Sequence, residues 1–226
     1  MRIGEIIATQ STHFVAESFE LNSPPPLGLF VAVSLPGGSD GFSSPVDLFA
    51  VVTHGQTVGL DPGRHAMRRS TDVVFDDAVY REHPELNRTL RTEFQAALVG
   101  FSVAGQVRQH LPPRPPPLHF SVRPASEEEV RRFTDTLHYL RLLLDSTGET
   151  PPLQVLAANV REVYRQRGND RDWLHAAARE IATLLKNDHE ALLTVLYAID
   201  PGKAPSLSER SQLPSDQTMA SQGGSR

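Results

Sequence analysis

Cysteine is absent from the 226-residue chain, and tryptophan occurs only once. The lack of cysteine excludes disulfides, iron–sulfur clusters and thiolate zinc sites, and it is consistent with a reducing cytosol. No stretch approaches the roughly 20 apolar residues of a membrane-spanning helix. An acidic residue, Glu5, stands where a signal peptide would have its apolar segment. We therefore expect a cytoplasmic protein that does not contact a membrane.

An excess of positive charge is also lacking, because the formal net charge is -5 at pH 7. We therefore expect no broadly basic surface, and any contact with nucleic acid would be indirect or limited to a local patch. The loop Gly-x-x-x-x-Gly-Lys-Ser/Thr, in which backbone amides and a lysine hold nucleotide phosphates, is missing as well. The nearest Gly-Lys pair, Gly202-Lys203, is followed by Ala204-Pro205 and has no preceding strand. The sequence predicts no ATP hydrolysis and no bound cofactor.

Short strands dominate the first half of the chain. Larger apolar residues alternate along Gly28–Leu35, which predicts a strand with one apolar face, and Leu48–Val52 is apolar throughout, which predicts a strand buried on both faces. Two later strands are predicted at Gln95–Gln106 and Leu118–Val122. Between them, the proline-rich strap Leu111–Pro117 lacks the amide donors that a helix or a central strand needs.

Helical periodicity begins at Ser126, which forms a capping-box pattern with Glu129. The first predicted helix carries an apolar stripe from Val130 to Leu144. Three more helices are predicted to begin near Pro152, Asp170 and Asp188, with the last one ending before Pro201-Gly202. One earlier short helix is predicted after Pro84, carrying Leu86 and Leu90.

These elements predict an α+β fold in which a small N-terminal β-barrel is followed by a C-terminal helical bundle. We place the barrel, with its inserted helix and proline-rich strap, at residues 1–125. The helical module follows at 126–201. Residues 202–226 are too polar to offset the entropy of ordering, so a disordered tail is predicted there.

The strand pattern resembles the HAS barrel, which HerA-type hexameric ATPases share with rotary ATP synthase subunits. The resemblance rests on four stretches, Ile3-Gly4-Glu5-Ile6-Ile7, Phe14, Leu27–Val33 and Ala50–Val52. In that family the barrel helps to assemble the ATPase ring and docks partners, including a nuclease in the HerA systems. This chain departs from the family because it lacks the ATPase motif. The resemblance therefore implies a non-enzymatic adaptor or accessory subunit that self-associates or binds a HerA-type ATPase or its nuclease.

Five residues are candidates for binding a partner. Arg64, Arg68 and Arg69 form the densest basic group and could contact phosphate. Arg114 lies in the proline-rich strap, and Trp173 has the side chain of an interface anchor. Each also has a purely structural interpretation: the arginines as an exposed loop, the strap as bracing, and the tryptophan as a core residue.

Two other classes of function are compatible with the sequence. Asp72, Asp76 and Asp77 could hold magnesium in a metal-dependent nuclease working beside a HerA-type motor, although carboxylates in such a segment are usually solvated. A nucleic-acid-binding barrel would instead use the arginine group. The nine histidines show no spacing typical of metal ligands, and we predict no catalytic residue and no metal site.

Overall fold

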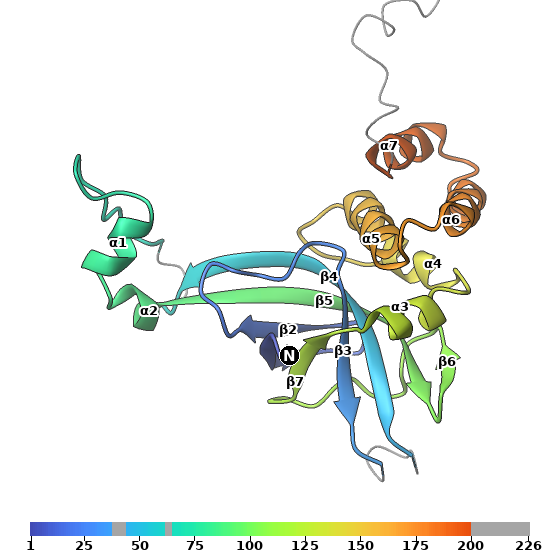
Figure 1. The fold of residues 1–226 in the computed structure, drawn as a ribbon, viewed down its shortest axis with the longest axis horizontal. Helices are drawn as coiled ribbons and strands as arrows, with labels where there is room; N and C mark the ends of the chain where they lie inside the picture. Colours follow the sequence, from blue (N-terminus) through green and yellow to red (C-terminus); the bar gives the residue numbers. More distant parts are fainter. Residues whose placement is uncertain (38–43, 62–64, 200–226) are drawn as a thin grey trace, which may run out of the picture.

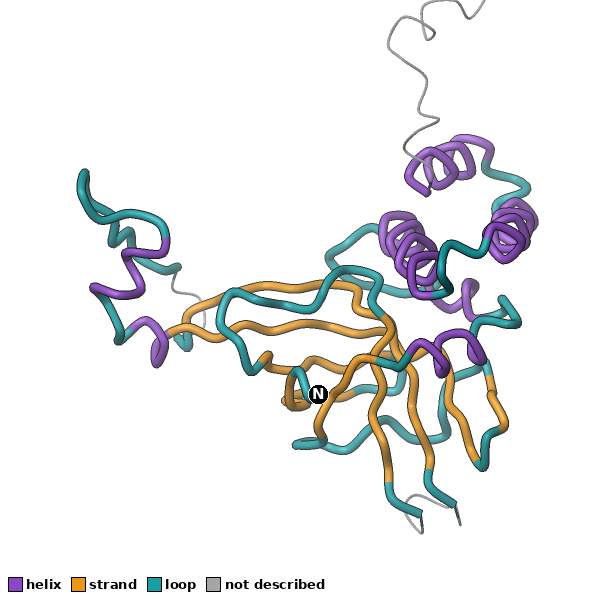
Figure 2. Tube along the Cα trace, in the orientation of Figure 1, coloured by secondary structure: helices purple, strands orange, loops and turns teal. Residues whose placement is uncertain are grey.

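The computed structural model describes residues 1–37, 44–61 and 65–199 (Figure 1). Arg64 and the predicted tail at 202–226 lie outside the described residues. The described chain divides visibly into strands, a helical layer on one side of them, and a separate small excursion at the far end of two long strands (Figure 2).

Six antiparallel strands form a closed N-terminal barrel, which confirms the predicted barrel and the α+β class. The hydrogen-bonded order is β2-β1-β7-β3-β4-β5, and β2 pairs with β5 to close the ring. A seventh strand, β6, extends the sheet as a hairpin on the end of β5. The strands are β1 (Gly4–Thr9), β2 (His13–Ser18), β3 (Phe30–Leu35), β4 (Val46–Gly59), β5 (Leu90–Val103), β6 (Gln106–Arg108) and β7 (Ser121–Pro124).

Side-chain alternation along the strands builds two hydrophobic cores. Val31, Val33 and Leu48 point into the barrel, whereas Phe30 and Phe49 point outward into a core shared with the helices. Because alternate residues of a strand face opposite sides, a strand between two cores must be apolar throughout. This confirms the prediction for Leu48–Val52. It also shows that β3 is buried on both faces over Phe30–Val33, not on one face as the alternation predicts.

Two predicted strands end or begin elsewhere. The strand predicted at Gln95–Gln106 begins earlier, at Leu90, so the helix predicted to carry Leu90 ends before it. It stops at Val103 because Ala104 and Gly105 both have positive φ angles, 46° and 78°, which turn the chain into β6. Leu118 is exposed and precedes β7, and the proline-rich strap contains neither helix nor strand, as predicted.

Five helices follow in residues 126–199: α3 (Glu127–Phe133), α4 (Tyr139–Leu144), α5 (Pro152–Gln166), α6 (Arg171–Leu184) and α7 (His189–Ile199). The predicted capping box is present, since the Ser126 hydroxyl accepts from the Glu129 amide at 3.3 Å and the Glu129 carboxylate accepts from the Ser126 amide at 2.8 Å. The carboxylates of Asp170 and Asp188 cap α6 and α7, each by accepting from a backbone amide three residues on.

The first predicted helix is interrupted, and α3 and α4 replace it. Its apolar stripe gave no sign of a break, but three carbonyls at the break bond to distant side chains. Gln109 Nε2 donates to Phe133 O at 2.6 Å and to Thr136 O at 2.9 Å, and Trp173 Nε1 donates to Thr134 O at 2.8 Å. These long-range donors satisfy carbonyls that a continuous helix would use itself.

The helices cover one flank of the barrel, and a single hydrophobic core includes residues of the barrel strands, such as Phe30, and of the helices, such as Phe133. A buried polar chain reinforces the contact. The Tyr139 hydroxyl donates to Asn159 Oδ1 at 3.1 Å, and Asn159 Nδ2 donates to Gly28 O at 2.9 Å. Gly28 has φ 84°, and a Cβ at this position would lie 2.4 Å from the Asn159 backbone nitrogen. Only glycine fits where α5 crosses the entry to β3.

Among the described helices, none combines the length and the apolar character that a membrane span requires.

Candidate docking surface

Strands β4 and β5 continue beyond the barrel as a two-stranded ribbon, here called the arm. The two strands stay paired from Val46↔Val103 to Gly59↔Leu90. On their other sides, β3 pairs with β4 only as far as Val51, and β2 pairs with β5 only from Glu93 to Ala97. Residues 57–59 and 90–92, the arm, are paired with each other but with neither β3 nor β2, and they project from the barrel on the side away from α5, α6 and α7 (Figure 1).

Polar contacts hold the two strands together where the arm leaves the barrel, and they tie the arm to the loop between β2 and β3. The hydroxyls of Thr57 and Thr92 lie 2.8 Å apart, and the Asn22 amide donates to Thr92 Oγ1 at 2.7 Å. The carboxylate of Glu93, which is largely buried, pairs with Arg91 at 2.7 Å and accepts from Gln56 Nε2 at 3.2 Å. The Thr57–Thr92 and Gln56–Glu93 contacts cross between β4 and β5, whereas Arg91 pairs with Glu93 along β5 itself. The cross-strand contacts stabilise the ribbon.

The arm carries an excursion between its two strands, here called the insert, described at residues 60–61 and 65–89. It contains two short helices, α1 (Asp77–Glu82) and α2 (Leu86–Thr89). None of its described residues is buried. It nevertheless holds four of the nine large apolar side chains that are exposed in the described chain: Leu60 (47% exposed), Met67 (61%), Val73 (84%) and Phe75 (58%).

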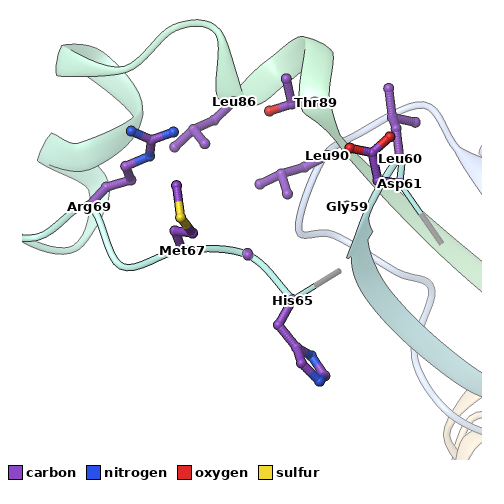
Figure 3. A pocket seen from close by; sticks show the side chains of 10 residues that line it. Gly59, Leu60, Asp61, His65, Met67, Arg69, Leu86, Thr89 and Leu90 are labelled. Carbon is purple, nitrogen blue, oxygen red and sulfur yellow. The ribbon is translucent and has the colours of Figure 1, made fainter. Parts of the chain in front are cut away.

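A pocket of about 370 Å³ lies where the insert meets the end of the arm (Figure 3). Met67, Leu86 and Leu90 form its apolar part. Arg69 stands at one end and Asp61 at the other, so the rim carries opposite charges at opposite ends. Its remaining lining residues are Gly59, Leu60, His65, Ala66 and Thr89.

Beyond the pocket, residues 72–77 form a projecting turn, here called the knob. The Thr71 amide donates to Val74 O at 2.8 Å, and the Val74 amide donates back to Thr71 Oγ1 at 3.1 Å. This local turn presents Val73 and Phe75 to solvent. Three exposed carboxylates accompany them, those of Asp72, Asp76 and Asp77.

The structure brings two of the five candidate residues to this surface. Arg68 and Arg69 are exposed on the insert, and Arg69 lines the pocket. Arg64 lies outside the described residues. Arg114 is exposed on the proline-rich strap, away from the pocket lining. Trp173 is 6% exposed and packs in the core under the guanidinium of Arg167, 5.7 Å from its ring centre, so it offers almost no surface to a partner.

Sequence reasoning missed the apolar residues of the surface. Val73, Val74 and Phe75 form an apolar triplet inside an otherwise polar stretch. From the sequence alone such a triplet could equally be buried, because the sequence does not show whether a side chain is exposed. The three aspartates proposed for a nuclease lie on the knob, and within the described part of the chain no three or more acidic or histidine side chains gather as a metal site would require.

A second cavity, of about 420 Å³, lies at the barrel wall and is lined by Arg2, Ser34, His119, Phe120, Ser121 and Arg123. One of its two arginines is already paired, because Arg123 contacts both carboxylate oxygens of Glu129, at 2.7 and 2.8 Å, and Asp47 at 3.3 Å. The hydrogen bonds from Arg123 lower the pKa of Glu129 to about 2. The positive charge of Arg123 is therefore paired within the chain.

No family model matches the chain, and a search of curated proteins finds no match either. The fold and the surface define its class in structural terms: an α+β protein with a closed six-stranded barrel that projects, on a two-stranded arm, an insert with exposed apolar side chains.

Proposed function

We propose that this chain is a non-enzymatic accessory subunit that binds a protein partner through the insert. The observation that carries the proposal is an ordered excursion whose described residues include none that is buried, yet which exposes Met67, Val73 and Phe75. Fixing a residue costs about 1–2 kcal/mol of backbone entropy. Burial of these side chains against a partner supplies free energy that the insert does not gain from a core of its own.

The composition of the surface also favours a protein partner. Exposed Met67 is followed in the chain by Arg68 and Arg69, and exposed Phe75 is followed by Asp76 and Asp77. Apolar anchors beside charged side chains are typical of protein interfaces. The arm holds this surface away from the barrel, so a partner can approach it without contacting α5, α6 or α7 (Figure 1).

The resemblance to HAS barrels supports a place for this subunit beside a HerA-type ATPase or its nuclease, in the cytoplasm, with nucleic acid contacted only through the partner. We further propose that α3 to α7 act as a bundle that braces the barrel. Phe133 and Tyr139 pack against Phe30 in the shared core, which fixes the root of the β3–β4 pair.

The test is a variant in which a two-residue Asn-Gly turn replaces residues 60–89, between Gly59 and Leu90. We expect it to fold, because the insert contributes no described core residue. Tagged full-length chain and variant are expressed in native cells, and the proteins they retain are compared. A surface substitution on α6, Arg179→Glu, serves as the control. Loss of partners from the turn variant alone supports the proposal, and retention of the same partners by that variant contradicts it.

A further inference from the structure

We infer that the protein seated on the insert is a second copy of this chain, with the knob of each copy filling the pocket of the other. The inference rests on the proposed function, because it names the occupant of the same surface. Knob and pocket belong to one insert, so a two-fold axis between two inserts makes both contacts at once.

Shape supports this pairing. The pocket offers about 370 Å³ with an apolar part formed by Met67, Leu86 and Leu90. The knob presents Phe75, 58% exposed, beside Val73, 84% exposed. Phe75 does not line the pocket of its own chain. Each copy therefore has an uncovered apolar projection and an unfilled apolar hollow, and each supplies what the other lacks.

Charge supports the same pairing and sets its orientation. The knob brings the carboxylates of Asp72, Asp76 and Asp77, whereas Arg69 stands at one end of the pocket. The acidic knob is attracted to this end and repelled by Asp61 at the opposite end. Arg69 also acts weakly on Glu85, whose pKa is lowered mainly by a hydrogen bond to its own backbone.

The same charges disfavour nucleic acid as the occupant. The described residues of the insert include four arginines and six carboxylates, so their formal charge is negative. A phosphate backbone would be repelled by the knob. A second copy, in contrast, brings its acidic knob to the basic end of the pocket.

The first test uses the absence of native cysteine, which makes every introduced thiol unique. Chain carrying Val73→Cys is mixed with chain carrying Met67→Cys under mild oxidation. We expect a mixed disulfide, because the knob of one chain lies in the pocket of the other. Arg179→Cys on α6 replaces Met67→Cys in the control mixture. Cross-linking no faster than in that control overturns the inference.

The second test measures association of the purified chain by sedimentation. Wild type is expected to form dimers, and Phe75→Asp is expected to raise the dissociation constant by about 100-fold, as loss of a central aromatic anchor does. Thermal unfolding of the monomer should stay unchanged, which separates lost association from misfolding.

A third test reverses the charges of the knob and of the pocket. One variant carries Arg68→Glu with Arg69→Glu, and the other carries Asp72→Arg with Asp76→Arg. Neither should self-associate, because the knob and the end of the pocket at position 69 then carry the same sign. Mixing the two should restore a heterodimer, because opposite signs meet again at both contacts. Failure of the mixture to associate overturns the inference.

The outcomes separate this inference from the proposed function. If wild type remains monomeric at high concentration while the Asn-Gly turn variant fails to retain some other protein, the dimer inference is wrong and the proposal that the insert binds a partner stands. If the turn variant keeps all its partners and wild type is monomeric, both fail.

Discussion

The two ends of the β4–β5 pair have opposite environments. At the barrel end, Phe49 and Val51 are buried between strands and helices, and Phe49 meets Phe133 with ring centres 5.0 Å apart. At the arm end, the same strands lead to an insert in which Phe75 is 58% exposed. An aromatic side chain thus contributes to folding at one end and is available for binding at the other. Stability and recognition are separated along one ribbon.

The largest expected effect compares the two phenylalanines directly. Phe133→Ala should lower the free energy of unfolding by about 3–5 kcal/mol, because it removes a ring that contacts Phe30, Phe49 and Tyr139. Phe75→Ala, the same chemical change, should alter it by less than about 0.5 kcal/mol under conditions where the chain is monomeric. Urea denaturation of both variants measures the difference. If both variants lost a similar free energy of unfolding, the barrel end and the insert would not differ in their contribution to stability.

The next effect tests the close approach of α5 to the barrel. Gly28→Ala places a Cβ 2.4 Å from the Asn159 nitrogen and 2.5 Å from Ala158 C, so the backbone must shift, at a cost of about 2–4 kcal/mol. Gly105→Ala is the matched control. Its φ is also positive, at 78°, but a Cβ there meets nothing within 4 Å, so about 1 kcal/mol is expected. Equal midpoints in a denaturant titration would contradict this account.

A smaller effect tests the buried polar chain between α4, α5 and the entry to β3. Asn159→Ala leaves the Gly28 carbonyl and the Tyr139 hydroxyl without their partner, which should cost about 2–3 kcal/mol. Tyr139→Phe removes only the hydroxyl that donates to Asn159 and should cost about 1 kcal/mol. Calorimetric melting measures the loss of stability in each variant. A larger loss in Tyr139→Phe than in Asn159→Ala would contradict the proposed series of hydrogen bonds.

The smallest effect is a pH dependence at the junction of barrel and helices. The pKa of Glu129 falls from its ordinary value of 4.5 to about 2 because Arg123 binds the ionised form. The stabilisation is therefore complete above about pH 4.5 and is lost as pH falls towards 2, by about 1–2 kcal/mol. In Glu129→Gln this part of the acid dependence should vanish. Parallel acid-unfolding curves for variant and wild type would show that the pair contributes nothing.

Local signals in the sequence predict local structure well here. The capping box at Ser126 and the cap at Asp170 depend on residues three positions apart, and both are present. Closure of the barrel needs β2 to meet β5, far along the chain, and no local pattern fixes such a register. The break between α3 and α4 depends on Gln109, which a stripe of apolar residues cannot reveal.

Of the candidate surface, only the charged residues could be predicted from the sequence. Arg68 and Arg69 form a dense basic group in the sequence and lie on the surface proposed here. Trp173 attracts attention as the sole tryptophan, yet its indole donates to Thr134 O inside the core. The exposure of Phe75 follows from the absence of a sheet or helix packed over the insert, which is a property of the whole fold.

The length of the insert also has an entropic consequence for folding. Closing a loop becomes less favourable by about 0.6 kcal/mol with each doubling of its length. The pairing of Gly59 with Leu90 closes a loop that spans residues 60–89, where a two-residue turn would suffice. About four doublings separate the two, so the insert opposes barrel formation by roughly 2 kcal/mol. The Asn-Gly turn variant should therefore unfold at a higher temperature than the natural chain, and the natural barrel is less stable than its own strands allow.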